Sequence, residues 1–523
     1  MGSDDHDHDK ISDNYVILRP EEVSLYGLIG ILVSSDIACK AFVKIPTEKE
    51  ENIKDRGILF RCLLGQKLLQ SFSVPMLKLG SALETWLNIL SSNNNLSLLL
   101  LRVLQEPTIL LRIAWPRWDL ASVAIFDSAF SGKVVVPDKT GDKFLSVIGH
   151  LDRRVELDKN IKHGDCKYYA MLCAMASKLS YENKAVVEKT VQDCWKMELL
   201  GYYDFWNDYQ RKATTQGFMF QDKISVPDTI IIAFRGTETF DADAWCTNID
   251  LSWYEFEMGK IHEGFMKALG LVINQGWPKE YEQESKKPLA YYTLREELKK
   301  FLKQNSRTKF ILTGHSQGGA LAILFPAVLA LHEETQLLES LEGVYTFGQP
   351  RVGDENFKNF MENQLDKYNN FKYLRFVYCN DLIPRLPHDD STFFFKHFGT
   401  CLYYNSCYEG KIVEEEPDKN YILLAMIPTI LNAWWELLRS FILPYMEGPD
   451  FVETGLLKFA RFVGLVFPGF AAHCPQDYVN LTRLGFPDNI LIQASRKVYG
   501  KVSSFEEIKF DRENHVITQL PQD

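Results

Sequence analysis

The chain has 523 residues and is rich in core-forming side chains, with 46% hydrophobic and 13% aromatic residues. Its 58 basic and 69 acidic side chains give a net charge of −11. These values exclude an intrinsically disordered chain, and they argue against a general nucleic-acid-binding protein, which needs a basic surface.

The first ten residues, MGSDDHDHDK, are acidic and polar. A secretory signal begins with basic residues and continues with an apolar run, so we expect an intracellular protein without such a signal. The ten cysteines include no C-x-x-C pair, and no nearby set of cysteines and histidines completes a zinc site. The sequence therefore predicts reduced thiols and no metal centre.

Residues 1–120 form an N-terminal segment with several apolar stretches, which are interrupted by Pro75, Gly80 and a run of asparagines. No stretch reaches the roughly 18 to 20 uncharged apolar residues that a membrane-spanning helix needs. Two interpretations stay open. The segment forms helices that pack on a neighbouring domain, or it associates with a lipid surface.

From residue 121 onward, strand-like and helix-like runs alternate. Four apolar runs are predicted as buried strands, at 229–236, 309–314, 343–350 and 372–381. Continuous apolar strands separated by helices are typical of a parallel sheet that is covered on both faces. We therefore predict an α/β domain over residues 121–523.

The second of these strands ends in Gly314-His315-Ser316-Gln317-Gly318, and an apolar helix-like run follows. This is the G-x-S-x-G pattern of a nucleophile elbow, in which the serine lies on a strained turn between a strand and a helix. A side chain at Gly314 or Gly318 would collide with neighbouring elements. The alternative is that Ser316 is only a small residue in a glycine-rich connection, but the flanking strand and helix favour a nucleophile.

A serine nucleophile needs an acid and a histidine, which follow it in that order in the fold that carries this elbow. Asp381 directly follows KYLRFVYCN, at the C-terminal end of the fourth run, where such sheets build their sites. Its alternative is a turn-forming residue before a proline-rich loop. Two histidines stay open as the base. His473 begins a new element after a Gly/Pro turn, whereas His397 lies in an aromatic run, and the spacing favours His473.

In this arrangement His473 would take the proton of Ser316, and Asp381 would hold the imidazole in the required tautomer. The tetrahedral intermediate also needs hydrogen-bond donors for its oxyanion. We assign one to the backbone amide of Gln317, and the second to Thr237, which follows the first strand and a glycine. This chemistry needs no metal or organic cofactor.

An apolar insertion lies between Asp381 and His473, near residues 410–460, and its most apolar part is Tyr421–Met446. Proline and charged residues interrupt this part, so a simple membrane-spanning helix is not predicted. A buried or interfacial helical hairpin fits better.

Four blocks of sequence resemble class 3, or fungal-type, lipases and occur in the order typical of that family. They are IIIAFRGTETFDADAWCTNID, KIHEGF, TGHSQGGALA, and YTFGQPRVGD together with FVYCNDLIPRLP. They cover roughly residues 228–388, with a weaker match around His473. The sequence upstream and downstream of these blocks is similar to that of plant oil-body triacylglycerol lipases.

The resemblance implies an α/β-hydrolase fold with a mostly parallel central sheet. It also implies a triad of Ser316, Asp381 and His473, with oxyanion donors at Thr237 and Gln317. A mobile lid is expected near residues 238–256, with an apolar inner face; its members would be Trp245, Ile249, Leu251 and Trp253. The alternative for this stretch is an ordinary half-buried helix.

The implied activity is hydrolysis of triacylglycerol esters at a lipid–water interface through an acyl-enzyme intermediate. A phospholipase A1 or galactolipid acyl hydrolase is the alternative on the same scaffold. A catalytically silent, lipase-like scaffold protein is a further alternative, which the retained triad and elbow glycines disfavour. The expected partners are an acylglycerol and the surface of a lipid droplet (oil body) or membrane. The sequence does not predict the oligomeric state or the preferred acyl chain.

Overall fold

The computed structural model describes most of the chain, namely residues 12, 14–33, 42–45, 56–92, 136–163, 165, 167–224, 228–272, 276–284, 286–368, 372–389, 394–417, 426–446, 451, 453–466 and 469–485. The predicted domain boundary near residue 120 lies outside these residues, as does the start of the predicted apolar part at 421–425.

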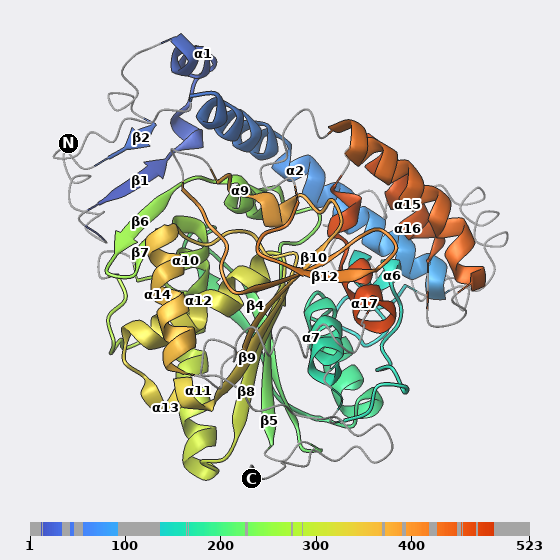
Figure 1. Cartoon of the computed structure of the whole chain (residues 1–523). Coiled ribbons are helices and arrows are strands. Elements are labelled where there is room, and N and C mark those ends of the chain that lie inside the picture. The colour runs from blue at the N-terminus through green and yellow to red at the C-terminus, as the bar shows by residue number, and fades with distance from the viewer. Residues whose placement is uncertain are drawn as a thin grey trace, which may run out of the picture.

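An eight-stranded sheet in the order β12-β11-β10-β9-β8-β5-β4-β3 forms the centre of the molecule (Figure 1). Its strands are β3 Glu198–Asn207, β4 Lys212–Asp222, β5 Thr229–Phe234, β8 Lys309–His315, β9 Leu341–Phe347, β10 Lys372–Tyr378, β11 Thr400–Tyr404 and β12 Gly410–Val413. The five strands from β5 to β11 pair in parallel, and antiparallel strands flank them on both sides. The four predicted strands correspond to β5, β8, β9 and β10, which confirms the predicted mostly parallel sheet.

Helices cover both faces of this sheet (Figure 1), and each face has its own hydrophobic core. One face carries α10 Glu263–Leu269, α11 Ala290–Gln304, α12 Gln317–Leu331, α13 Thr335–Ser340 and α14 Glu355–Lys367. The other carries α7 Tyr168–Leu179, α8 Lys184–Lys189 and α17 Pro475–Leu484. Every residue of β5 is buried, as expected for a strand covered on both sides. The chain therefore has the predicted α/β-hydrolase architecture.

The N-terminal segment is joined to this domain through a second, small sheet in the order β2-β1-β6-β7. Its strands are β1 Tyr15–Leu18, β2 Val43–Lys44, β6 Trp253–Phe256 and β7 Gly259–His262. β1 pairs antiparallel with β6, with Val16 opposite Trp253. Residues near the start of the chain thus complete a sheet whose strand β6 forms the end of the predicted lid stretch.

Two helices of the N-terminal segment, α1 Leu25–Val33 and the 37-residue α2 Arg56–Ser92, lie along one side of the molecule (Figure 1). α2 packs on α9 Ala242–Ile249, with the Cys62 thiol 3.0 Å from the Ile249 carbonyl oxygen. Farther along α2, a side chain at Gly80 would come within 2.5 Å of Phe240. Pro75 does not end the helix, since both halves pack on the segment around α9.

The apolar insertion forms two neighbouring helices, α15 Met426–Met446 and α16 Gly455–Gly464. They lie on the same side of the molecule as α2 and α9, with the short α6 Val147–Leu151 nearby (Figure 1). The hairpin predicted within Tyr421–Met446 is wrong for the described part of that stretch, because Met426–Met446 is one continuous helix and α16 lies beyond it. In the part of the chain that the structure describes, no helix is both long and apolar enough to cross a membrane.

Candidate active site

The predicted elbow is a tight turn between β8 and α12. β8 ends at His315, α12 begins at Gln317, and Ser316 between them has φ 58° and ψ −131°. A positive φ is strained for a residue with a side chain and is concentrated at functional sites. A Cβ at Gly314 would lie 2.2 Å from the carbonyl carbon of Gly318, and a Cβ at Gly318 would lie 2.2 Å from the Phe234 oxygen. The close contact of strand and helix therefore requires both glycines.

Asp381 and His473 come from distant parts of the chain and are in direct contact. Asp381 follows β10, and His473 ends a short 3-10 helix, Ala471–His473, which leads into α17. The Nδ1 atom of His473 lies 2.8 Å from Oδ2 and 3.0 Å from Oδ1 of Asp381. The Asp381 carboxylate is fully buried, and the backbone amide of Ile383 donates to its Oδ1 at 2.9 Å. This geometry directs Nε2 of His473 away from the acid.

Tyr478 on α17 is a further partner of Asp381 that the sequence analysis did not single out. Its hydroxyl donates a hydrogen bond to Asp381 Oδ2. Gly348, with φ 60°, leaves room for this contact, because a Cβ there would lie 2.8 Å from Asp381 Oδ2 and 2.9 Å from the Tyr478 hydroxyl. Tyr478 lies five residues after His473, on the helix that follows it, and this position was the signal available in the sequence.

His315, the neighbour of Ser316, links the elbow to the His473 segment. Its Nε2 lies 2.9 Å from the His473 carbonyl oxygen, and the two imidazole centroids are 4.5 Å apart. Because a carbonyl can only accept, Nε2 carries the proton, and Nδ1 accepts from the Tyr181 hydroxyl at 2.8 Å. Burial, with a contribution from His473, lowers the pKa of His315 well below its usual value. A neutral His315 therefore connects β8 to the backbone of His473.

Two reactive atoms near this contact are buried and unpaired. Among the described residues, neither Ser316 Oγ nor His473 Nε2 has a hydrogen-bond partner. Ser316 is 1% exposed and His473 7%. Buried polar atoms are rarely left unpaired, and an exception calls for a functional explanation. A hydroxyl that can donate and an imidazole nitrogen that can accept match a nucleophile and its base.

Thr237 and Gln317, the predicted oxyanion residues, are also in contact. Thr237 follows β5, and its hydroxyl donates to Gln317 Oε1 at 3.2 Å. The side-chain amide of Asn248 on α9 donates to the Thr237 hydroxyl at 2.8 Å. Gln317 opens α12, and an amide in the first turn has no acceptor within its own helix. The helix dipole adds positive potential at this end.

A helix covers this site, but it is shorter than the predicted lid. The indole of Trp245 on α9 lies 5.3 Å from the Phe470 ring and 6.3 Å from the His473 ring, between centroids. Ile249 ends the helix and packs towards Gly65 of α2. The predicted lid stretch therefore contains a covering helix over Ala242–Ile249 only.

Leu251 and Trp253 lie outside that helix. This differs from the expectation that they share the apolar inner face of a lid with Trp245 and Ile249. At Asp250 the backbone becomes extended, and the Asp250 carboxylate accepts from the amides of Leu251 and Ser252. Trp253 then starts β6, and both side chains are buried in a core with residues of β1 and α2. The N-terminal segment supplies this core.

His397, the other candidate base, lies against the acid loop instead of the elbow. Its Nε2 lies 2.7 Å from the Pro384 carbonyl oxygen and 3.6 Å from Glu416. The guanidinium of Arg385 donates to the carbonyl of Asp381 itself. Both side chains bind the backbone of the loop that carries Asp381.

In the described part of the chain, no group of three His, Cys, Asp or Glu side chains could hold a metal ion.

Comparison with known proteins places this site in a family. The family model Lipase (class 3) matches residues 231–391, which include the elbow and Asp381. Triacylglycerol lipase OBL1 of Arabidopsis thaliana is 40% identical, over 92% of this chain and 96% of the relative. The protein of the same name from Ricinus communis is 34% identical, over 91% and 95%. The triacylglyceride lipase structure of Rhizomucor miehei is 23% identical and covers 49% of this chain and 88% of its own, with a TM-score of 0.37. The family model and the two long relatives show that the chain belongs to the class 3 lipases.

Proposed function

We propose that this lipase hydrolyses triacylglycerols at the surface of an intracellular lipid droplet, with Ser316, Asp381 and His473 as its catalytic triad. The observation that carries the proposal is the pair of buried, unpaired atoms Ser316 Oγ and His473 Nε2. Nδ1, the second nitrogen of the His473 ring, is bound by Asp381. The names of the long relatives support the substrate class.

In the proposed mechanism, Ser316 Oγ attacks the ester carbonyl while His473 Nε2 takes its proton. The Asp381 carboxylate accepts a hydrogen bond from the Nδ1–H of His473 and stabilises the imidazolium that forms. The amides of Gln317 and Thr237 donate to the oxyanion, each contributing on the order of 3 kcal/mol. His473 then protonates the leaving alcohol, and water hydrolyses the acyl-enzyme by the same steps in reverse.

The covering helix α9 would act as the lid. Ser316 is 1% exposed, so an acyl ester can reach Oγ only after a covering element moves, and α9 contacts both His473 and Thr237. Trp245 is held by aromatic contacts to Phe470 and His473, each of which contributes about 1 kcal/mol in typical proteins. An oil surface would replace these contacts and favour the open position.

Association with a lipid surface is supported by apolar side chains on the side of the molecule that carries α9. α2, α15 and α16 all expose large apolar residues there, and α2 alone contributes Leu68, Phe72, Val74, Leu77 and Leu79. Both segments that the sequence suggested for lipid contact, the N-terminal one and the insertion, thus contribute to this side.

The test compares wild type with Ser316→Ala and with Ser340→Ala, a buried serine on α13. The substrates are triolein emulsion, phosphatidylcholine vesicles, galactolipid and monomeric p-nitrophenyl butyrate. We expect Ser316→Ala to lose at least 1,000-fold in kcat and Ser340→Ala to stay near wild type, because a triad nucleophile has no substitute. A fluorophosphonate should label Ser316. Hydrolysis retained in Ser316→Ala would refute the triad, and a preference for vesicles or galactolipid would refute the substrate class.

A further inference from the structure

α15 has the reverse of the usual distribution of polar and apolar residues for a surface helix. Its buried residues are all polar: Thr429, Glu436, Arg439 and Ser440. Its exposed large residues are all apolar or aromatic, and they recur every three or four positions: Ile427, Leu431, Trp434, Trp435, Leu438, Phe441, Ile442, Tyr445 and Met446. That spacing places them on one face of the helix. The helix therefore presents its apolar face outward.

α16 and the residues after it continue this apolar surface. Phe459, Phe462, Val463, Val466 and Phe470 are exposed, whereas Leu457, Arg461 and Gly464 face inward. α15 and α16 pack side by side at the edge of the molecule (Figure 1). We call the exposed apolar residues of α15 and α16, together with Val466 and Phe470, the α15–α16 surface. A contiguous apolar surface of this kind usually marks a binding site for protein or lipid.

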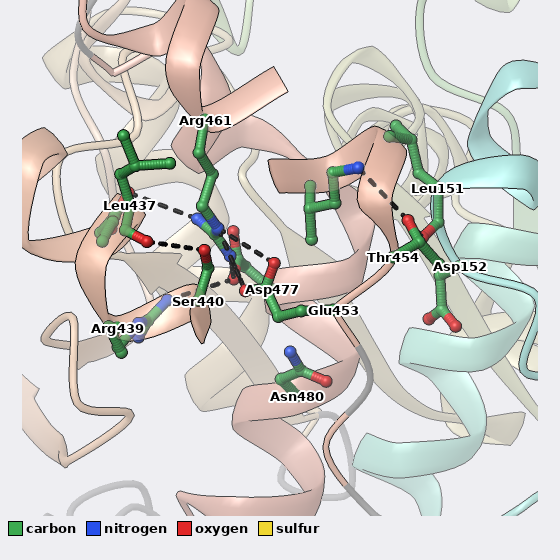
Figure 2. A network of polar contacts seen from close by, with 12 residues as sticks. Leu151, Asp152, Leu437, Arg439, Ser440, Glu453, Thr454, Arg461, Asp477 and Asn480 are labelled. Carbon is green, nitrogen blue, oxygen red and sulfur yellow. Dashed lines mark hydrogen bonds and ion pairs between the residues drawn. The ribbon is translucent and has the colours of Figure 1, made fainter. Parts of the chain in front are cut away.

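A buried ionic cluster holds the two helices in this orientation (Figure 2). Arg461 of α16 lies 2.7 Å from Glu453, 2.8 Å from Asp477 and 3.4 Å from Glu436 of α15. Burial raises the pKa of Glu436 and of Glu453, and the Arg461 guanidinium opposes that shift.

A second arginine extends the cluster to the sheet. Arg439 of α15 donates to the Tyr378 hydroxyl of β10 at 2.9 Å and lies 3.8 Å from Asp477. Rotating α15 to bury its apolar face would leave these buried charges without partners, at a cost of several kcal/mol. The outward apolar face is therefore built into the fold.

The position of the α15–α16 surface indicates what covers it. Phe470 lies at its end and contacts Trp245 on α9, which in turn contacts His473. The surface thus runs directly to the cover of a site whose substrate is an acyl ester. Lys458 of α16 holds its ammonium 4.5 Å from the Phe441 ring centroid, at the margin of the apolar residues. A positive charge is thus placed against exposed apolar side chains, a combination that suits a lipid surface with phosphate headgroups.

We propose that the α15–α16 surface inserts into the acyl layer of the phospholipid monolayer around an oil droplet and brings α9 to that layer. The inference rests on the proposed function, since the droplet is chosen because its core would be the substrate. It assigns docking to the insertion before His473 and makes the contribution of α2 secondary. Tryptophan and tyrosine on the surface suit the boundary between headgroups and acyl chains.

The test is flotation of the full chain with artificial droplets that have a triolein core and a phosphatidylcholine monolayer. The variant is Leu431→Glu with Leu438→Glu, two exposed positions whose change leaves the core intact. The matched control is Ile224→Glu, an equally exposed apolar residue after β4, at the opposite end of the sheet from Ser316. Phe72→Glu on α2 tests the N-terminal segment. If the glutamate variant does not fold, Leu431→Ser with Leu438→Ser replaces it.

We expect the double variant to lose at least about tenfold in droplet partitioning, because a carboxylate in an acyl layer is strongly disfavoured. Its hydrolysis of monomeric p-nitrophenyl butyrate should stay within about twofold of wild type, as should that of Ile224→Glu and Phe72→Glu. Flotation equal to wild type would overturn the proposal. The proposal would also be overturned if the wild type were a dimer and the double variant a monomer that still floats. It would be overturned as well if the double variant lost binding to phosphatidylcholine vesicles without triolein to the same extent as binding to droplets. A wild type that floats through this surface but hydrolyses no ester would refute the proposed function alone.

Discussion

Replacing Tyr478 by phenylalanine tests whether the acid of the proposed triad depends on its neighbour. The Tyr478 hydroxyl donates to Asp381 Oδ2 and accepts from the backbone amide of Tyr378 at 3.3 Å. Burial, reinforced by Asp381, raises the pKa of Tyr478 far above its usual value, so the hydroxyl stays protonated and donates. Tyr478→Phe removes only that oxygen and leaves Asp381 bound by the Ile383 amide and His473.

A hydrogen bond to a buried carboxylate contributes about 1.5 to 3 kcal/mol. If the whole amount is lost from the transition state, kcat falls about 10- to 150-fold, at 1.4 kcal/mol per factor of ten. The KM for a monomeric ester should change little, because Tyr478 is 1% exposed and lies behind the acid. Tyr478 and Asp381 are both buried in the native core, so the free energy of unfolding of Tyr478→Phe should be about 2 kcal/mol lower than that of wild type.

The assay measures kcat and KM on p-nitrophenyl butyrate together with thermal unfolding. The matched control is Tyr292→Phe on α11, which removes a hydroxyl that donates to the Pro278 carbonyl at 2.8 Å. It should lose about 1 kcal/mol of stability without a change in kcat. A Tyr478→Phe enzyme with lowered stability and wild-type kcat would refute the reasoning, because the bond would then be purely structural.

Further predictions concern neighbouring groups. Gly348→Ala puts a Cβ 2.8 Å from Asp381 Oδ2 at φ 60°, so kcat should fall at least about 100-fold in steady-state assays. Trp245→Ala removes the aromatic contacts of α9, the proposed lid, so activity on monomeric esters should rise about fivefold relative to emulsions. Arg461→Met removes the arginine that pairs with three buried carboxylates, which should cost about 3 to 5 kcal/mol in urea unfolding. Burial lowers the pKa of His262 from 6.5 to about 4, so the unfolded chain takes up its proton first as the pH falls. The stability that the neutral His262 contributes is complete above pH 6.5, and about 3 kcal/mol of it is lost by pH 4. The melting temperature of His262→Gln should therefore depend less on pH over this interval than that of wild type.

Each of these has a result that contradicts it. Wild-type kcat in Gly348→Ala would mean that the turn tolerates a methyl group beside the acid. An unchanged activity ratio in Trp245→Ala would remove the argument for α9 as a lid. Unfolding of Arg461→Met at wild-type urea concentration would show that the cluster is not needed for stability, and an unchanged pH slope in His262→Gln would assign acid sensitivity to other groups.

Much of the catalytic core could be predicted from the sequence, because its signals are local. β5, β8, β9 and β10 are short, continuous apolar runs, and a strand buried on both faces needs such a run. The elbow glycines follow from the close contact of strand and helix. Chain order and the end of β10 pointed to Asp381. The choice between His473 and His397 stayed open on spacing, since spacing does not tell which loop returns to the elbow.

The tertiary structure alone determined the partners that come from distant segments. Tyr478 and His315 acquire their roles through contacts with Asp381 and with the His473 backbone, which no local pattern encodes. The covering helix α9 ends at Ile249, and Trp253 beyond it pairs with Val16 of β1 and with His262 of β7. Periodicity could show that α15 is amphipathic, but not which face is covered. That depends on Arg461 and Asp477, whose buried charges hold the polar face inward and leave the apolar face exposed beside the active site.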